Sequence, residues 1–217
     1  MVANIKSIAE RFVPAPQEFL EGRWRLPRFT YSDAMAMVRI GIIPEDASTE
    51  LLNGMVVLKD RAAAGEDPSM IGQDHRKCVE RLCSLRKTID NDMRHVESQQ
   101  PLMCSETHVP EPDFMVLRGT LDDSTDLPTP SEVFCVAEVA DASYERDAGD
   151  KLRGYARAGI EQYIIINLRN RTAEIYAQPD LGAGTYPPPT VVAADATLPL
   201  HVGQSEFHSV PMSRILP

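Results

Sequence analysis

The chain has 217 residues, a net charge of −10 and a hydrophobic content of 43%. This length suits one globular domain with a substantial core, and the composition is ordinary for a water-soluble protein. The longest apolar run is far too short for a membrane span, and the first residues contain no signal-peptide core. The acidic balance argues against non-specific nucleic-acid binding by the protein as a whole. We therefore expect a cytoplasmic protein with no membrane partner.

Cysteine and histidine patterns predict no zinc site and no disulfide. None of the four cysteines forms a Cys-x-x-Cys pair, and the five histidines are scattered. Cys78, Cys83 and Cys135 lie among apolar residues and are expected to be buried, reduced thiols. Positive charge gathers in segments 76–94 and 151–157, so a basic face on an acidic protein remains possible.

Turn and cap signals divide the chain into alternating helices and strands. Ser32 is expected to cap the first helix and Gly41 to end it, and Asn53-Gly54 is typical of a tight hairpin. The predicted elements are an irregular arm over 1–29, a helix over 30–41, a hairpin over 49–58, a long helix over 73–92, strands over 96–109, 113–118 and 133–139, a helix over 147–158, strands over 163–168 and 172–177, and a tail with one or two short β segments.

The order of these elements predicts the fold class. From residue 73 onward it is helix, three strands, helix and strand, which is typical of an α/β domain with a mixed sheet. The helix over 147–158 is long enough for a right-handed crossover between parallel strands. We expect an N-terminal arm over 1–29 and a single domain over 30–217.

Two of the predicted central strands each present one carboxylate. Asp113 stands at the head of an apolar run, and Glu138 lies inside another. An apolar run of this kind predicts a strand buried on both faces, where a carboxylate is costly unless it is paired or bound to a cation. With Lys151 close behind, the pattern indicates a site for a divalent metal ion.

Four blocks of residues follow one another along the chain. They are Glu50-Leu51-Leu52-Asn53-Gly54, His75, Glu111-Pro112-Asp113, and Glu138-Val139 followed by Asp147, Lys151, Tyr155, Ala158-Gly159 and Tyr163. In these blocks the chain resembles the Uma-type restriction endonuclease family of the PD-(D/E)xK nuclease superfamily, and the likeness extends over about residues 28 to 210. The resemblance implies a restriction-endonuclease-like core of order αβββαβ, a DNA substrate and a homodimer.

The resemblance also implies a role for each site residue. Asp113 and Glu138 would hold Mg²⁺ or Mn²⁺, together with the backbone carbonyl of Val139. Glu50 would be a further acid of the catalytic site. The superfamily places its lysine two residues after the second acid, where this chain has Ala140. In the Uma-type pattern Lys151, on the following helix, would replace it and activate the attacking water.

Structural interpretations compete with these roles. Asp113 could merely start a strand, Glu50 could be a solvated surface acid, and Lys151 could be an i,i+4 partner of Asp147. The remaining candidates at the edge of the site also have ordinary alternatives, in which Asp147 caps or braces its helix, His75 donates a hydrogen bond at a helix start, and Tyr155 belongs to the core.

Two functions of different classes follow. The first is a metal-dependent endonuclease that acts on DNA. The second is a catalytically inactive nuclease-fold module that binds protein or nucleic acid, which Ala140 and the acidic balance favour. A structural oligomer would leave the buried Glu138 without an explanation.

Overall fold

A computed structural model describes residues 27–59, 72–123 and 126–217, and a six-stranded mixed sheet forms its centre. Strand order across the sheet is β3-β4-β5-β6-β7-β8. Strands β5 and β6 run parallel, whereas the other neighbouring pairs are antiparallel. The strands are β3 (Arg94–Glu97), β4 (Phe114–Arg118), β5 (Val133–Ala140), β6 (Gln162–Asn167), β7 (Thr172–Ala177) and β8 (Thr190–Val192).

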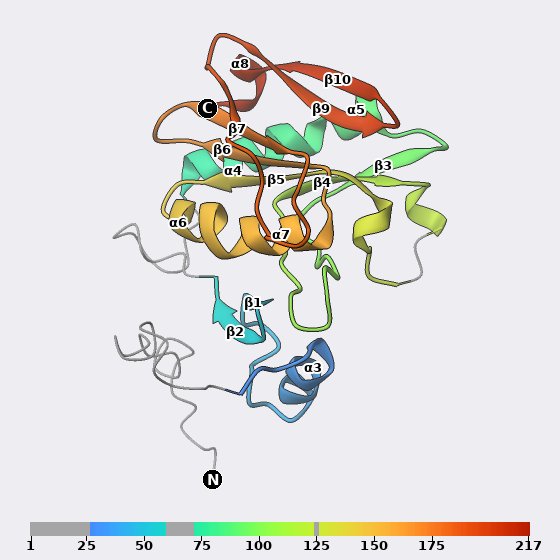
Figure 1. The fold of residues 1–217 in the computed structure, drawn as a ribbon, viewed down its shortest axis with the longest axis vertical. Helices are drawn as coiled ribbons and strands as arrows, with labels where there is room; N and C mark the ends of the chain where they lie inside the picture. Colours follow the sequence, from blue (N-terminus) through green and yellow to red (C-terminus); the bar gives the residue numbers. More distant parts are fainter. Residues whose placement is uncertain (1–26, 60–71, 124–125) are drawn as a thin grey trace.

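Helices and a two-stranded ribbon cover both faces of this sheet (Figure 1). One face packs against helices α4 and α5, the β9–β10 ribbon and helix α8, and the other against a continuous helical segment made of α6, η3 and α7. The bounds are α4 (Gln73–Ser84), α5 (Arg86–Ile89), α6 (Tyr144–Arg146), η3 (Asp147–Lys151), α7 (Leu152–Ala158), β9 (Thr197–Gly203), β10 (Glu206–Pro211) and α8 (Met212–Ile215), with short 3₁₀ turns η1 (Leu121–Asp123) and η2 (Pro130–Glu132) between β4 and β5.

Alternation along β5 produces two hydrophobic cores. Ala137 and Val139 belong to the core beneath α4 and the ribbon. Val136 and Ala140 belong to the core beneath α7. Side chains in a strand alternate between faces, so Glu138 occupies an apolar position of the α7-side core. All eight residues of β5 are buried, which explains why its sequence reads as a continuous apolar run.

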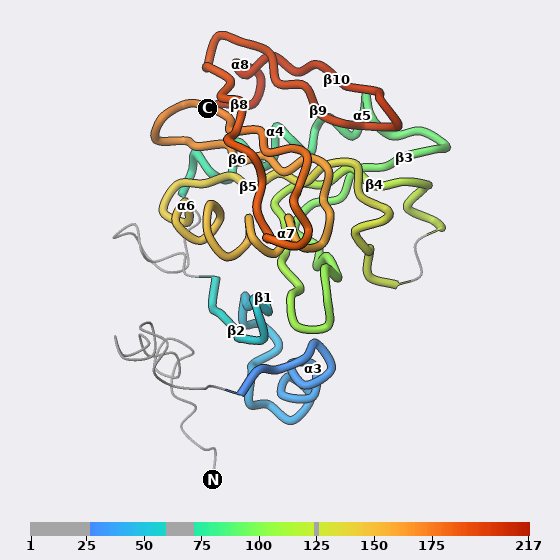
Figure 2. Tube along the Cα trace, viewed as in Figure 1, coloured from blue at the N-terminus to red at the C-terminus, as the bar shows by residue number. Residues whose placement is uncertain are grey.

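A smaller unit lies beyond α7, away from the sheet (Figures 1 and 2). It contains helix α3 (Tyr31–Arg39) and the hairpin β1 (Thr49–Leu52)–β2 (Met55–Leu58). The hairpin turns at Asn53 and Gly54, both with positive φ, as the Asn-Gly signal predicts. A long connection between β3 and β4 reaches down to this hairpin, where Leu51 and Val109 exchange two backbone hydrogen bonds of 2.7 and 3.3 Å.

The predicted fold class is confirmed, and the hairpin, the two central strands and the parallel β5–β6 crossover are where the sequence places them. Several boundaries are corrected. The first helix is capped by Thr30 rather than Ser32, because Thr30 and Asp33 form a reciprocal capping box. The tail holds three strands and a short helix instead of one or two β segments.

Three predicted elements differ more substantially. The long helix is interrupted at Leu85 and ends at Ile89, because Leu85 takes a tighter i−3 hydrogen bond to Leu82 and Asp90 is extended. The strand expected over 96–109 is only Arg94–Glu97, since Gln99 turns the chain with a positive φ of 54°. The helix expected from Asp147 begins at Tyr144.

The expected N-terminal arm falls largely on residues 1–26, outside the described residues. Cys78 and Cys135 are buried free thiols as expected, whereas Cys83 is only partly buried. No helix in the described part of the chain is long and apolar enough to cross a lipid bilayer.

Two glycines with similar backbone angles should respond differently to alanine. Gly54 and Gly41 have φ of 78° and 73°, so alanine is strained at both, by about 1–2 kcal/mol. A Cβ at Gly54 would also lie 2.5 Å from the Cβ of Arg28, whereas at Gly41 it would meet nothing within 4 Å. We expect Gly54→Ala to lower the free energy of unfolding clearly more than Gly41→Ala in chemical denaturation. Equal losses would contradict this close approach of Arg28 to the hairpin.

Candidate active site

Strand register brings the two predicted acids together. Phe114 of β4 pairs with Ala137 of β5, so one residue further along this antiparallel pair Asp113 stands opposite Glu138. Side chains of opposed residues project from the same face. The backbone amide of Val139 donates a 2.9 Å hydrogen bond to Asp113 Oδ2. This bond fixes the start of β4 against β5 beside Glu138.

Glu138 is paired inside the core beneath α7. Its Oε1 accepts hydrogen bonds from Lys151 Nζ at 2.9 Å and from the Tyr155 hydroxyl at 2.8 Å. Burial, followed by the nearby acids, raises the pKa of Glu138 to about 8, although the ammonium of Lys151 opposes the shift. The carboxyl group is therefore easily protonated in the absence of additional positive charge.

Lys151 lies in a π-helical turn. Residues Asp147 to Lys151 form this turn between the α-helical segments α6 and α7. In an α-helix, residues that are four apart advance by slightly more than one full turn of 3.6 residues, whereas in the wider π turn they advance by slightly less. A segment that contains both kinds of turn therefore keeps Asp147, Lys151 and Tyr155 in line on the side facing the sheet. All three are buried. π turns of this kind are frequently found at functional sites.

The β1–β2 hairpin supplies the second partner of Lys151. Glu50 Oε1 lies 2.8 Å from Lys151 Nζ and also accepts a hydrogen bond of 2.8 Å from the backbone amide of Glu111. A further lysine, Lys59 at the end of β2, lies 3.9 Å from the same oxygen and 2.7 Å from Glu111 Oε2. Burial would raise the pKa of Glu50, but Lys151 and Lys59 outweigh it and lower the pKa.

The state of Lys151 follows from these neighbours. Burial alone would lower the pKa of the amine, but Glu138, Glu50 and Asp147 outweigh this effect and raise the pKa above its ordinary value. The amine is therefore charged at neutral pH. One ammonium group thus joins the central sheet, through Glu138, to the hairpin, through Glu50.

His75 and Asp147 complete the edges of the cluster. His75, in the first turn of α4, has Nε2 3.3 Å from Asp113 Oδ2. Burial would raise the pKa of Asp113, but His75, Lys151 and the Val139 amide lower it. Asp147 accepts a 2.5 Å hydrogen bond from Ser143. Because the helix begins at Tyr144, Asp147 braces its interior and does not cap its start.

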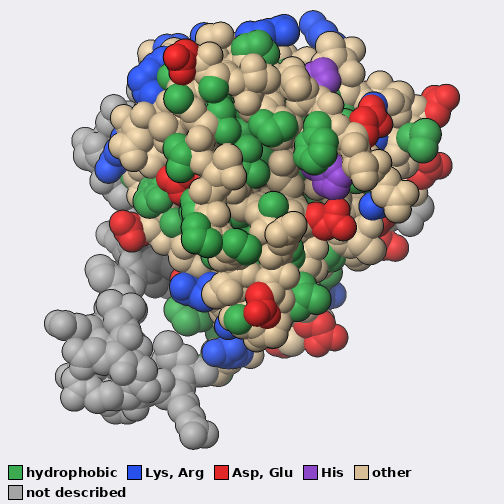
Figure 3. Space-filling view, turned by 45° about the horizontal axis from the view of Figure 1, so that its top comes forward, with side chains coloured by type: hydrophobic (Ala, Val, Ile, Leu, Met, Phe, Trp, Pro, Cys, Tyr) green, Lys and Arg blue, Asp and Glu red, His purple; other side chains and the backbone are tan. Residues whose placement is uncertain are grey.

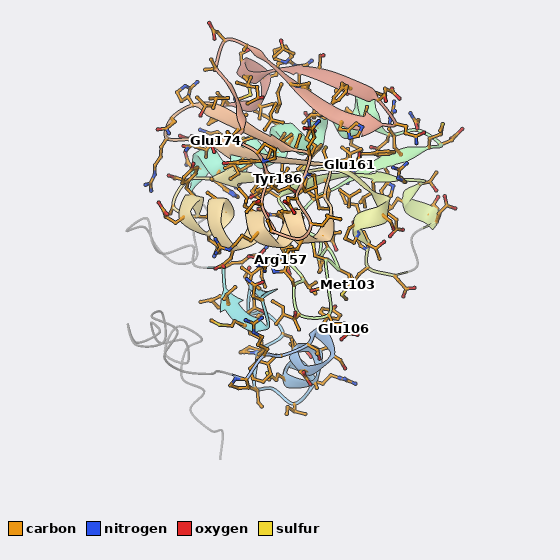
Figure 4. The ribbon with its side chains drawn as sticks, in the orientation of Figure 1. Met103, Glu106, Arg157, Glu161, Glu174 and Tyr186 are labelled. Carbon is orange, nitrogen blue, oxygen red and sulfur yellow. The ribbon has the colours of Figure 1, made fainter. Side chains whose placement is uncertain are left out.

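Aromatic rings pack behind Tyr155. The ring centroids of Tyr155 and Tyr163 are 4.7 Å apart, and Tyr176 follows at 5.9 Å from Tyr163. Tyr186, which Figure 4 labels above α7, extends this row and donates a hydrogen bond to the carbonyl of Ile160. Glu174, also labelled in Figure 4, accepts hydrogen bonds from the Tyr144 and Tyr176 hydroxyls. These rings exclude water from one side of the acid cluster.

The oxygen atoms left over by these contacts suit a cation. Among the described residues, every hydrogen bond to Asp113 falls on Oδ2 and every one to Glu138 on Oε1. Glu50 Oε2 and Asp147 Oδ1 are buried without a hydrogen-bond partner. The cluster holds four buried carboxyl groups against one buried ammonium. Hard divalent cations prefer such oxygen ligands, so the residues present fit Mg²⁺ or Mn²⁺.

The acids are nevertheless not arranged as a finished metal cage. Within the described ranges, no three His, Cys, Asp or Glu side chains already form a metal-binding group. The Lys151 ammonium lies between Glu138 and Glu50. A bound cation would therefore have to share the carboxylates with the lysine and use their second oxygens.

All the predicted site residues lie in this one cluster, and the Lys151 amine reaches Glu138. The roles of these residues as ligands or catalysts stay predictions. Ala140 is fully buried in the α7-side core, so β5 supplies no ammonium of its own. Sequence reasoning missed Lys59 and His108, because neither belongs to a periodic pattern or a motif with a known spacing.

The basic segment 76–94 offers little unpaired charge. Arg76 and Lys77 form exposed ion pairs with acids of their own helix. Arg94 makes two hydrogen bonds to Glu206 of β10. The possibility of a basic face therefore gains no support from this segment.

Comparison with known proteins assigns the family. The family described as "Putative restriction endonuclease" (Uma2) matches residues 44–212, which is well over half of the chain. The chain belongs to the Uma2 family. The likeness inferred from Glu50, Asp113, Glu138 and Lys151 is thus confirmed at the level of the family.

One solved structure supports the fold. It is described as a "putative nuclease belonging to DUF820 from Anabaena variabilis ATCC 29413". The likeness covers 87% of this chain and 99% of that one, with a TM-score of 0.62 and 13% sequence identity. At this identity the comparison shows a shared fold. A search of curated proteins gives no match.

The raised pKa of Glu138 predicts a specific pH dependence of stability. A carboxyl group whose folded pKa lies above its unfolded value binds more protons when folded, so the free energy of unfolding falls as pH rises between about 4.5 and about 8. Glu138→Gln should remove this fall. The measurement is urea unfolding of both proteins from pH 5 to 8, and parallel pH profiles would contradict the assignment.

Proposed function

We propose that this Uma2 protein is a metal-dependent endonuclease that hydrolyses DNA phosphodiester bonds. The observation that carries the proposal is the opposed pair Asp113 and Glu138, on neighbouring strands, with the charged amine of Lys151 2.9 Å from the second acid. Membership in a family described as a restriction endonuclease supports a nuclease. Metal dependence is inferred from the chemistry of the cluster, and the DNA substrate is inferred from the resemblance alone.

Oδ1 of Asp113 and Oε2 of Glu138, together with the backbone carbonyl of Val139, would hold Mg²⁺ or Mn²⁺. Such an ion, when bound, acidifies a water molecule and neutralises charge on the phosphate. The protein holds the two carboxylates on adjacent strands, which keeps them in place without a large reorganisation. The aromatic rings around Tyr155 lower the local dielectric and strengthen every charge interaction in the cluster.

Lys151 acts as a fixed positive charge and hydrogen-bond donor. Because its pKa is raised, the amine cannot serve as a general base at neutral pH. It can orient the attacking water and stabilise negative charge that develops on the phosphate, which is the role of preorganised donors in active sites. Glu50 holds the amine from the hairpin side, so the hairpin is part of the site.

The alternative is an inactive nuclease-fold module that binds nucleic acid or protein. Ala140 at the usual lysine position, and the engagement of Lys151 by two carboxylates, favour it. The two functions differ in one measurable respect, since only the enzyme breaks phosphodiester bonds. Conversion of supercoiled plasmid to nicked or linear DNA with Mg²⁺ or Mn²⁺ present is therefore the deciding assay.

Substitutions should separate metal binding from catalysis. Asp113→Asn with Glu138→Gln should abolish both Mn²⁺ binding and plasmid cleavage. Lys151→Met should lower cleavage by about 10²-fold or more, because a preorganised charge is lost. It should retain or tighten Mn²⁺ binding in calorimetry, since a competing positive charge has gone. Lys87→Met, at an exposed lysine, is the matched control.

Two results would contradict these roles. Plasmid cleavage by Lys151→Met at the wild-type rate would remove the lysine from the mechanism. Unchanged Mn²⁺ binding by the Asp113→Asn, Glu138→Gln protein would show that the metal site is elsewhere.

We also propose that the protein works as a homodimer, because one site per chain cuts both strands of a duplex most simply through two-fold symmetry. The β-rich tail is a candidate interface. Phe207 of β10 and Val191 of β8 are more than half exposed. Figure 3 turns the top of the view in Figure 1 forward, and apolar side chains gather in the middle of the face that it shows. A second candidate interface, indicated by the apolar residues of the arm around Trp24, lies outside the described residues.

The dimer is tested by light scattering at micromolar concentration. A mass of two chains is expected, and Phe207→Glu should shift it towards one chain. A wild-type mass of one chain would remove the dimer proposal without touching the active-site assignment.

A further inference from the structure

His108 is a buried histidine that the predicted site does not use. It lies on the connection between β3 and β4, which descends past α7 to the hairpin (Figure 2). Met103 and Glu106, labelled in Figure 4, mark the same stretch of chain below α7. His108 is only 4% exposed. Its ring stands between the hairpin that carries Glu50 and the helix that carries Lys151.

On the hairpin side the ring accepts a hydrogen bond. The backbone amide of Asn53, at the hairpin turn, donates to His108 Nδ1 at 3.3 Å. Nδ1 is therefore unprotonated, and the proton of the uncharged ring is on Nε2. Burial, followed by the charge of Lys151, lowers the pKa of His108 to about 4, so the ring is uncharged at neutral pH.

On the helix side the ring lies directly against the backbone of α7. A Cβ at Gly154 would be 1.9 Å from His108 Nε2. This distance is a steric clash, so any other residue at position 154 would have to displace the helix or the ring. Nε2 is buried and has no hydrogen-bond partner. The ring edge also meets Tyr155, with centroids 6.5 Å apart at 88°. Only glycine at position 154 allows this approach.

The hairpin and the helix must keep this spacing for the site to exist. Glu50 on the hairpin and Glu138 on the sheet contact the same Lys151 amine at 2.8 and 2.9 Å. A displacement of the hairpin by about 1 Å would remove the first contact, and misplacements of that size cost about 10²-fold in catalysis. Asn53 Nδ2 also reaches Asp150 Oδ1 at 3.4 Å, but that contact is exposed to solvent, whereas the His108 contact is partly buried.

We propose that His108 is a positioning residue of the site: it fills the gap between the hairpin turn at Asn53 and Gly154 of α7, and so holds Glu50 against Lys151. The proposal deepens the proposed nuclease function and rests on it for its catalytic consequence. The geometric consequence, which is protection of the Lys151 amine, stands independently of any activity.

The test compares two substitutions of His108. Asparagine places an acceptor where Nδ1 was, whereas alanine removes it. His108→Ala should lower kcat by about 10²-fold with little change in KM and should expose Lys151 to an acylating reagent, read by mass spectrometry. His108→Asn should retain most of the kcat and keep Lys151 protected. Exposed Lys87 is the internal standard for labelling.

A second pair of variants tests the other side of the ring. Gly154→Ala should displace α7 or the ring, lower kcat and raise Lys151 labelling. Gly149→Ala is the matched control on the same helical segment, because its Cβ would meet nothing closer than Arg153 at 3.9 Å. If Gly154→Ala does not fold, the two His108 variants still decide the question.

Two outcomes would overturn the proposal. One is wild-type kcat and Lys151 labelling in His108→Ala. The other is equal loss in His108→Ala and His108→Asn, which would show that the acceptor for the Asn53 amide does not hold the hairpin in place. If the wild-type protein cuts no DNA, the nuclease function fails, whereas Lys151 labelling still reports on the role of His108.

Discussion

A single buried ammonium group connects the three parts of the structure that form the site. Lys151 connects Glu138 in the middle of the sheet to Glu50 on a hairpin outside the sheet. A buried ion pair contributes little net stability because its desolvation is costly, yet removal of one partner costs about 3–5 kcal/mol. Such an arrangement is therefore better explained by function than by stability. The pairing makes the hairpin, the helical layer and the central strand one unit.

The rest of the fold places the charges around that amine. The antiparallel β4–β5 register sets Asp113 opposite Glu138, and the π turn keeps Lys151 in line with Tyr155. The two cores support β5 from both faces, so the carboxylate cannot swing into solvent. An ammonium supplied by a helix reaches Glu138, whereas β5 itself has Ala140 two residues further on and supplies no charge. What matters chemically is the position of the charge, so its origin can change.

Sequence reasoning succeeded where a local pattern determines structure. The Asn53-Gly54 turn, the apolar run of β5 and the carboxylate within it are local signals, and the family blocks gave the acids and Lys151. It failed where tertiary contacts decide. The π turn, the break at Leu85 and the positive φ of Gln99 have no local signature. His108 and Lys59 acquire their places only when the β3–β4 connection meets the hairpin, a long-range contact that one sequence does not reveal.

A crystal structure with Mn²⁺ and its anomalous difference map would test the proposed metal site directly. We expect a peak at about 2.0–2.4 Å from oxygens of both Asp113 and Glu138, with the Lys151 amine still within direct or water-bridged reach of Glu138 and Glu50. A peak at another place, or a fully ordered acid cluster that binds no ion at saturating Mn²⁺, would contradict it.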